Sequence, residues 1–111
     1  MTFQRACALA DLPEGTAVRV EVDGLDVALV REGAEIFAIE DECSHASVAL
    51  SEGDVEGCTI ECWMHGSRFD LRTGKPIGLP ATEPVATFPI EVRPDGVYVD
   101  TDTTLNGVTP S

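Results

Sequence analysis

Hydrophobic and polar residues alternate along much of the chain with a period of two. Residues 16–22 (TAVRVEV) place three valines on one face, and residues 26–30 (DVALV) follow after an Asp-Gly turn. Alternation predicts half-buried strands, and an Asp-Gly pair between two strands predicts a hairpin. The same reasoning predicts further strands at 34–39, 58–62, 68–71, 85–92 and 97–100.

Prolines and glycines divide this pattern into short segments, and no window shows the 3.6-residue period of a helix. The chain has 10 glycines and 7 prolines. Short strands separated by turns predict an all-β domain, an antiparallel β-sandwich or small barrel. Pro89 falls inside a predicted strand, which indicates a sheet edge or a bulge. We expect one domain over residues 1–100, followed by a polar C-terminal tail at 101–111 that frays.

The middle of the chain, residues 41–84, departs from the alternating pattern. It is rich in turns, and it contains both histidines and three of the four cysteines. Functional residues concentrate on loops that a rigid scaffold carries. We therefore predict that this segment is a loop subdomain that carries the function.

Charge excludes several classes of partner. The 111 residues include 20 acidic and 7 basic side chains, a formal charge of −13. This balance argues against nucleic acid and against an anionic membrane surface, which both reward lysine and arginine. It is typical of a well-solvated surface and equally of a protein that is steered to a basic partner. With no apolar run long enough for a membrane span and no signal peptide, we expect a cytoplasmic protein.

Each histidine follows closely after a cysteine. One residue separates Cys43 from His45, two separate Cys62 from His65, and sixteen lie between the pairs. Two loops that each offer a thiolate and an imidazole can enclose a four-ligand site for zinc or iron. Zinc sites of this composition usually group like ligands together before a helix. The mixed pairs instead suit a 2Fe-2S cluster in which one iron takes both cysteines and the other both histidines.

The spacing Cys-x-His, sixteen residues, Cys-x-x-His resembles the motif of the Rieske iron–sulfur proteins. The segment HGSRFDLRTGKP (65–76) resembles the chain that follows the second ligand pair in Rieske ferredoxins, and GLPATEPVATFPIEV (78–92) resembles their proline-containing third loop and next strand. The resemblance runs from residue 2 to residue 100 and implies a Rieske-like fold with a cluster-binding subdomain.

The resemblance also implies one Rieske-type 2Fe-2S cluster and its ligands. Cys43 and Cys62 would bind the inner iron, and His45 and His65 the outer iron through their Nδ1 atoms. Pro80 would lie in a loop that covers the cluster from a third side. These four ligands and this loop are the candidate site.

Other positions are assigned by the same resemblance. Ser67 matches a serine that donates to a cluster sulfur in the high-potential branch, whereas Phe69 stands where that branch has a tyrosine. Fewer hydrogen bonds to the sulfurs disfavour the reduced form, so we expect a reduction potential near the low end of the family range. Trp63, between two ligands, is expected to shield the cluster, and docking of a partner is the alternative.

Two cysteines stay outside the ligand set. Val48 and Met64 stand where respiratory Rieske proteins carry a pair of disulfide-bonded cysteines, so no such bridge is implied. Cys7 and Cys58 match neither position. We expect them to be free, semi-buried thiols, and a bridge between them is left open.

The resemblance favours a one-electron carrier rather than an enzyme. Rieske ferredoxins take electrons from a flavin reductase and pass them to a terminal oxygenase. An oxygenase subunit would need further histidines for a mononuclear iron, and both histidines are already used. Alternatives are the small subunit of an assimilatory nitrite reductase, a Rieske protein associated with iron–sulfur assembly, and a zinc-stabilised binding domain. We expect a monomer whose partners are redox proteins.

Overall fold

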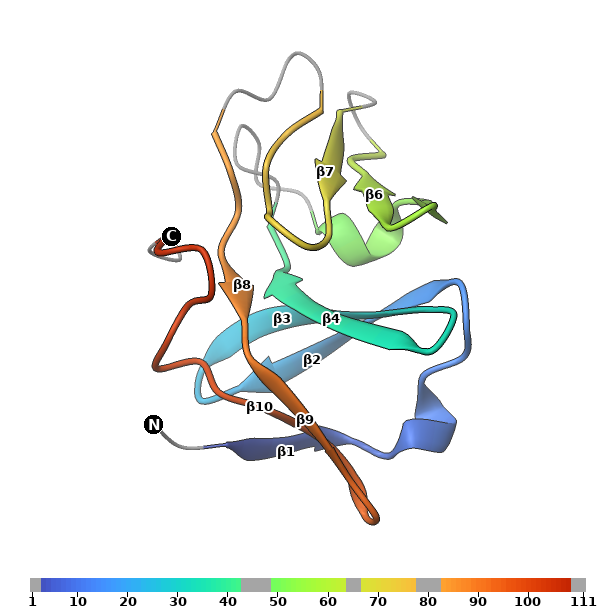
Figure 1. Ribbon diagram of the computed structural model, residues 1–111, viewed down its shortest axis with the longest axis vertical. Coiled ribbons are helices and arrows are strands. Elements are labelled where there is room, and N and C mark those ends of the chain that lie inside the picture. Colours follow the sequence, from blue (N-terminus) through green and yellow to red (C-terminus); the bar gives the residue numbers. More distant parts are fainter. Residues whose placement is uncertain (1–2, 43–48, 64–66, 78–82, 109–111) are drawn as a thin grey trace.

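The computed structural model describes residues 3–42, 49–63, 67–77 and 83–108, and these form three antiparallel sheets (Figure 1). The strand orders are β1–β10–β9, β2–β3–β4–β8 and β5–β6–β7. The first sheet contains β1 (Gln4–Cys7), β9 (Ile90–Arg93) and β10 (Gly96–Val99). The second contains β2 (Thr16–Val22), β3 (Leu25–Glu32), β4 (Glu35–Glu40) and β8 (Thr87–Phe88). The third contains β5 (Val55–Glu56), β6 (Thr59–Glu61) and β7 (Arg68–Asp70), and two short 3₁₀ helices are η1 (Leu9–Asp11) and η2 (Leu50–Glu52).

The hairpin predicted from the first alternating segments is present. Residues 16–22 form β2, and the chain turns into β3 at Asp23 and Gly24, whose φ angles of 52° and 81° are left-handed. Turns with two left-handed residues match the twist of paired strands, which is why an Asp-Gly pair favours them. The prediction of an all-β, antiparallel fold is confirmed.

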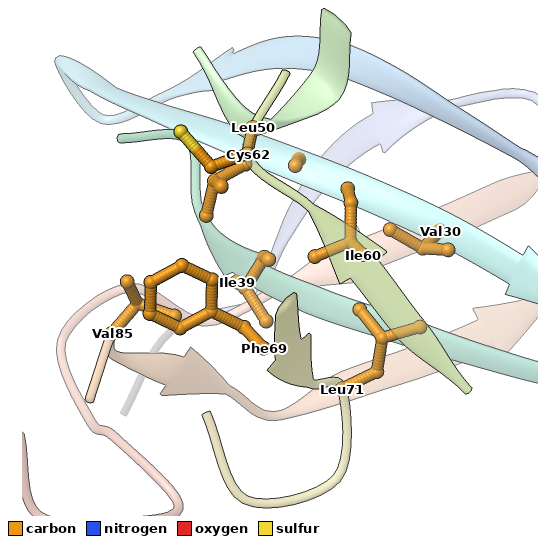
Figure 2. Close-up of a cluster of buried hydrophobic side chains, with 9 residues drawn as sticks. Val30, Ile39, Leu50, Ile60, Cys62, Phe69, Leu71 and Val85 are labelled. Atoms are coloured by element: carbon orange, nitrogen blue, oxygen red, sulfur yellow. The ribbon is translucent and has the colours of Figure 1, made fainter. Parts of the chain in front are cut away.

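β3 runs through the middle of its sheet and buries both of its faces. Ala28 and Val30 lie on one side and Val27 and Leu29 on the other, because successive side chains of a strand alternate. The two sides belong to two hydrophobic clusters. The site-side core (Figure 2) contains Ala28, Val30, Ile39, Leu50, Ile60, Cys62, Phe69, Leu71 and Val85. The barrel core contains Leu12, Val22, Val27, Leu29, Ala38, Ala86, Phe88, Val97 and Val99.

The third sheet depends on the second for its burial. Ile60 from β6 and Phe69 from β7 are fully buried, and both pack in the site-side core with Ile39 of β4. Figure 1 shows β6 and β7 at one end of the molecule, opposite the β9–β10 hairpin. The segment predicted as a loop subdomain therefore contains a small sheet that shares the core of the scaffold.

Pro89 separates two strands that the sequence analysis predicts as one. β8 pairs with β4 through Thr87 and Phe88, and this ladder stops at Pro89, which has no N–H to donate. After the proline, β9 pairs with β10 in a different sheet. The predicted edge or bulge is thus the point where the chain changes sheets.

Two other segments differ from expectation. β1 is not predicted, because residues 4–7 (QRAC) show no alternation, and it pairs with β10 from the far end of the chain. The expectation that the C-terminal tail frays is wrong for two of its residues. The Leu105 N–H donates to the Thr87 carbonyl at 2.8 Å, and Asn106 Nδ2 donates to the Val85 carbonyl at 2.8 Å.

Truncation of Leu29 tests the burial of β3 on the face that belongs to the barrel core. Leu29 is fully buried in the barrel core, so Leu29→Ala is expected to lower the free energy of unfolding by about 2–5 kcal/mol. Leu105 is 66% exposed, so Leu105→Ala is the matched control and should change stability by about 0.5 kcal/mol or less. Chemical denaturation of both variants gives the two values, and equal losses would contradict the assignment.

Candidate functional site

Of the four predicted ligands, Cys62 is the one that the structure describes, and it lies at the end of the third sheet. Cys43, His45 and His65 lie outside the described residues, as does Pro80. Cys62 follows directly after β6 and is fully buried. Within the described ranges no group of three or more His, Cys, Asp or Glu side chains could hold a metal ion. The placement of the complete ligand set therefore stays a prediction.

The setting of Cys62 fits a metal ligand that is protected from water. Its side chain packs at the edge of the site-side core, next to Leu50, and in Figure 2 its sulfur projects away from Ile60 and Phe69. A buried thiol on the border of a hydrophobic core is shielded on one side. Thiolate is a soft donor that suits iron–sulfur clusters and zinc equally, so this residue alone does not select the metal.

A backbone hydrogen bond joins the two residues that flank segment 63–66, the second ligand loop. The Cys62 N–H donates to the Ser67 carbonyl at 2.6 Å. This bond continues the β6–β7 ladder, in which Glu61 pairs with Arg68. Four residues, 63–66, lie between the bonded ends, and they include His65. Ser67 itself is buried, as expected for a residue that lies against the site.

The first ligand loop is closed by a side chain instead. Asp41, at the end of β4, accepts hydrogen bonds from the backbone N–H and the hydroxyl of Ser51, which belongs to η2. Cys43 and His45 lie between these two residues in the sequence. Asp41 is buried, which is unusual for a carboxylate without partners.

The segment before the third loop is fixed by a close backbone approach. Val85 N–H donates to the Gly74 carbonyl at 2.9 Å, and Ile77 N–H donates to the Arg68 carbonyl at 2.7 Å. Gly74 has a φ of +74°, and a Cβ at this position would lie 2.2 Å from the Val85 carbonyl oxygen. Only glycine meets both conditions. Residues 78–82, which include Pro80, lie between these anchored ends and outside the described residues.

Two aromatic residues near the ligands have opposite surroundings. Phe69 is fully buried in the site-side core, whereas Trp63 is 50% exposed. Ile77 is another exposed large hydrophobic residue at this end of the third sheet. Exposed apolar side chains beside a functional loop are typical of docking surfaces. Of the two roles expected for Trp63, its exposure favours docking.

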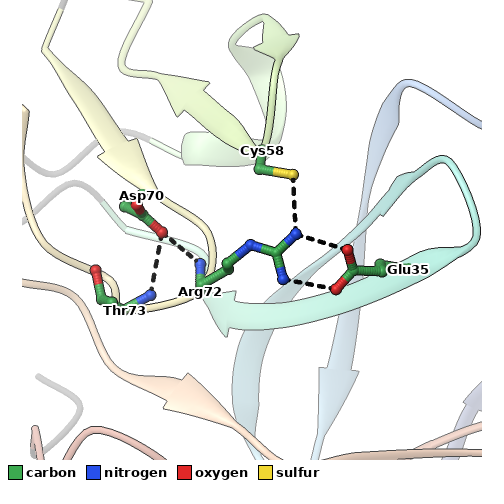
Figure 3. Close-up of polar contacts among 5 residues, drawn as sticks. All are labelled: Glu35, Cys58, Asp70, Arg72 and Thr73. Carbon is green, nitrogen blue, oxygen red and sulfur yellow. Dashed lines mark hydrogen bonds and ion pairs between the residues drawn. The ribbon is translucent and has the colours of Figure 1, made fainter.

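Arg72 ties the end of the third sheet to β4, which nothing in the sequence predicts (Figure 3). Its guanidinium donates to both carboxylate oxygens of Glu35, at 2.6 and 2.7 Å. This bidentate hydrogen bonding lowers the pKa of Glu35 below its usual value. Both side chains are half exposed, so solvent screening keeps the contribution to stability small. Asp70 fixes the turn before it by accepting from the backbone N–H groups of Arg72 and Thr73.

Cys7 and Cys58 are free and partly buried, as expected. The bridge between them that the sequence leaves open is therefore not formed. Burial, followed by the nearby charge of Asp11, raises the pKa of the Cys7 thiol. The Cys58 sulfur lies 3.7 Å from an Arg72 guanidinium nitrogen (Figure 3).

One protein family and three known proteins match this chain, and the four matches agree with one another. The family described as "Rieske [2Fe-2S] domain" matches residues 2–89. The 3-phenylpropionate/cinnamic acid dioxygenase ferredoxin subunit of Escherichia coli is 43% identical over 96 residues, which cover 86% of this chain and 90% of that protein. The ferredoxin of carbazole 1,9a-dioxygenase from Nocardioides aromaticivorans is 37% identical with a TM-score of 0.85, covering 89% of this chain and 97% of that one. A chain in a complex of reduced oxygenase and oxidized ferredoxin in carbazole 1,9a-dioxygenase is 40% identical with a TM-score of 0.82, covering 87% and 91%.

Within the described ranges, no helix has the length and apolar character that crossing a membrane requires.

Alkylation of the folded protein tests the surroundings of the described cysteines. Cys62 is fully buried and should be labelled most slowly of the three, while Cys7 and Cys58 are partly buried and should react. Because the pKa of Cys7 is raised, its labelling should increase as the pH rises above neutrality. Mass spectrometry of the labelled peptides gives each rate, with unfolded protein as the control. A Cys7–Cys58 cross-linked peptide in freshly purified protein would contradict the structure.

Proposed function

The chain belongs to the Rieske [2Fe-2S] family, and we propose that it carries single electrons from a flavin reductase to a terminal oxygenase. Its cofactor is one Rieske-type 2Fe-2S cluster, and it is an electron-transfer component rather than an enzyme in its own right. The observation that carries the proposal is the match of nearly the whole chain to ferredoxin subunits of dioxygenases, at 37% to 43% identity. This match favours an oxygenase system over the nitrite reductase and cluster-assembly alternatives.

The proposed ligands are Cys43 and Cys62 on one iron and His45 and His65 on the other. Burial of Cys62 and its position after β6 support this assignment. When bound, such a cluster accepts and releases one electron. Two thiolates cancel the charge of two ferric ions and two sulfides, so the oxidised centre is neutral and the reduced centre carries one negative charge. Two imidazoles in place of two thiolates make this reduction easier than with four thiolates.

The described residues around the ligands exclude water and limit the hydrogen bonds that the cluster can receive. Leu50 and Phe69 are fully buried beside Cys62 in the site-side core. Phe69 has no hydroxyl to donate to a sulfur, whereas Ser67 is buried and has one. Hydrogen bonds to the sulfurs stabilise the extra charge of the reduced form. We therefore propose a potential toward the low end of the Rieske range, raised somewhat by Ser67.

Trp63 and Ile77 are proposed as the apolar centre of the surface that contacts redox partners. Both are exposed and both lie next to loops that carry or cover the ligands. Glu42, Glu52 and Asp54 are exposed at the same end of the chain's second and third sheets. A formal charge of −13 favours partners with a basic rim around an apolar pocket, because long-range attraction accelerates encounter.

We propose a single Rieske domain over residues 1–100, in which 41–84 is the cluster-binding subdomain, acting as a monomer. The free thiols of Cys7 and Cys58 are compatible with a reducing compartment, which supports the cytoplasm as its location.

Two single cysteine variants, one at a proposed ligand and one at a free thiol, test the cofactor and its ligands. Cys62→Ser is expected to abolish the visible absorption of the oxidised protein and the EPR signal of the reduced protein, because one of four ligands is lost. Cys58→Ser is the matched control, since Cys58 is a free thiol outside the ligand set, and it should keep two irons and two sulfides per chain. Iron, sulfide and zinc are quantified in anaerobically purified protein. Colourless wild-type protein with one zinc and no sulfide would overturn the proposed function.

Two variants of Trp63 and one remote control distinguish docking from shielding at this residue. If Trp63 docks a partner, Trp63→Ala should weaken the apparent affinity for a dioxygenase flavin reductase about tenfold or more and leave the midpoint potential unchanged. Trp63→Phe should restore most of the affinity. Val92→Ala, at an exposed position on β9, serves as the remote control and should have no effect. Stopped-flow reduction and potentiometry give both quantities, and an altered potential with unchanged affinity would indicate shielding.

A further inference from the structure

Asp41 is a buried carboxylate, and both of its oxygens accept hydrogen bonds from Ser51. Its side chain has no exposed surface. Oδ1 accepts a hydrogen bond from the Ser51 N–H at 2.7 Å, and Oδ2 accepts one from the Ser51 hydroxyl at 2.6 Å. Hydrogen bonds to an ionised acceptor are about twice as strong as neutral ones, and burial strengthens them further.

Each half of this pair is itself fixed to the scaffold. The Asp41 N–H donates to the Asp26 carbonyl at 3.0 Å, which ties the end of β4 to the start of β3. On the other side, Leu50 is fully buried next to Cys62 in the site-side core. Gly53 packs η2 against β6 so closely that a Cβ there would lie 1.6 Å from the Glu61 carbonyl oxygen.

Arg19 supplies the opposite charge that this burial requires. Its Nε lies 3.7 Å from Asp41 Oδ2, and its guanidinium also pairs with the Asp26 carboxylate. Arg19 is half exposed and projects from β2. An unpaired carboxylate is strongly disfavoured in a buried site, so the pairing explains how Asp41 stays buried.

We propose that Asp41 and Ser51 are positioning residues that clamp the base of the first ligand loop and thereby fix the Cys43–His45 pair. Nine residues, 42–50, lie between them, and this segment begins and ends at the clamp. The inference rests on the proposed function, because the segment has ligands to position only if the cluster is bound. Asp41 is not part of the Cys-x-His and Cys-x-x-His motif, and the clamp gives it a structural role.

The clamp performs for the first loop what the Cys62–Ser67 backbone bond performs for the second. β4 pairs with β3 and β8 and not with η2, so no strand ladder holds the two ends of this nine-residue segment together. A fixed base reduces the number of conformations that the segment can reach, so less conformational entropy is lost when its ligands bind a metal. Loss of the Asp41–Ser51 hydrogen bonds should therefore increase the rate at which the ligands of the first loop dissociate from iron.

Ser51→Ala is the decisive variant because it removes one hydrogen bond and leaves every charge in place. In the cluster-loaded protein we expect chelator-driven iron release to be about tenfold faster, and the EPR g values of the reduced protein to shift. Amide exchange at residue 51 should also become faster, which reports on the clamp without any use of the cluster's activity. Ser51→Thr keeps the hydroxyl and should restore the wild-type rates.

Thr16→Val is the matched control, since it removes a hydroxyl that donates to the Pro13 carbonyl at 2.7 Å, away from the ligand loops. It should leave iron release and the EPR signal unchanged. Iron release from Ser51→Ala at the wild-type rate, with only a lower unfolding midpoint, would reduce the clamp to a general stabiliser and overturn the proposal. Wild-type protein without iron and sulfide would instead overturn the proposed function, and the clamp with it.

Discussion

The half of the molecule that contains Cys62 depends on the packing of the third sheet against β3 and β4. Sheets with strands of two or three residues are too small to be stable alone. β5, β6 and β7 have at most three residues each, and their inward side chains, Ile60 and Phe69, reach Ile39 and Val30 across the site-side core. Cys62 comes two residues after Ile60, so the same contact that buries the strand also places the ligand. Loss of this packing would remove the platform for the site before it affected the barrel core.

Backbone constraints then determine where the loops begin and end. Each predicted cluster segment is bracketed by a described contact, and the three contacts differ in chemistry: a carboxylate with a serine at Asp41 and Ser51, a ladder bond at Cys62 and Ser67, and a glycine-dependent bond at Gly74. The difference follows from the local geometry. β6 and β7 are antiparallel neighbours that can close a short loop by themselves, whereas β4 and η2 are not paired and need a side chain.

Patterns with a local cause could be predicted from the sequence, and features with a distant cause could not. Alternation and an Asp-Gly turn sufficed for β2 and β3. The paired spacing of Cys43, His45, Cys62 and His65 predicts a ligand set, of which the structure describes Cys62. β1 escaped prediction because only its pairing with β10 makes it a strand. The burial of Asp41 was missed for the same reason. In the sequence it stands among acidic residues, and only the folded chain brings Ser51 and Arg19 to it.

The distribution of acidic residues separates two electrostatic effects that the net charge combines. Glu42, Glu52, Asp54 and Glu56 are exposed, and salt screens exposed charges within about 10 Å at moderate ionic strength. Their influence on an electron added at the cluster is therefore weak, while their influence on the approach of a basic partner is collective and long-ranged at low salt. Asp41, like the neighbouring Glu40, is buried, and solvent cannot screen its charge. Arg19 compensates the negative charge of Asp41. The structure therefore keeps the hydrogen bonds of a buried carboxylate, while most of the repulsion between that carboxylate and an electron added at the cluster is cancelled.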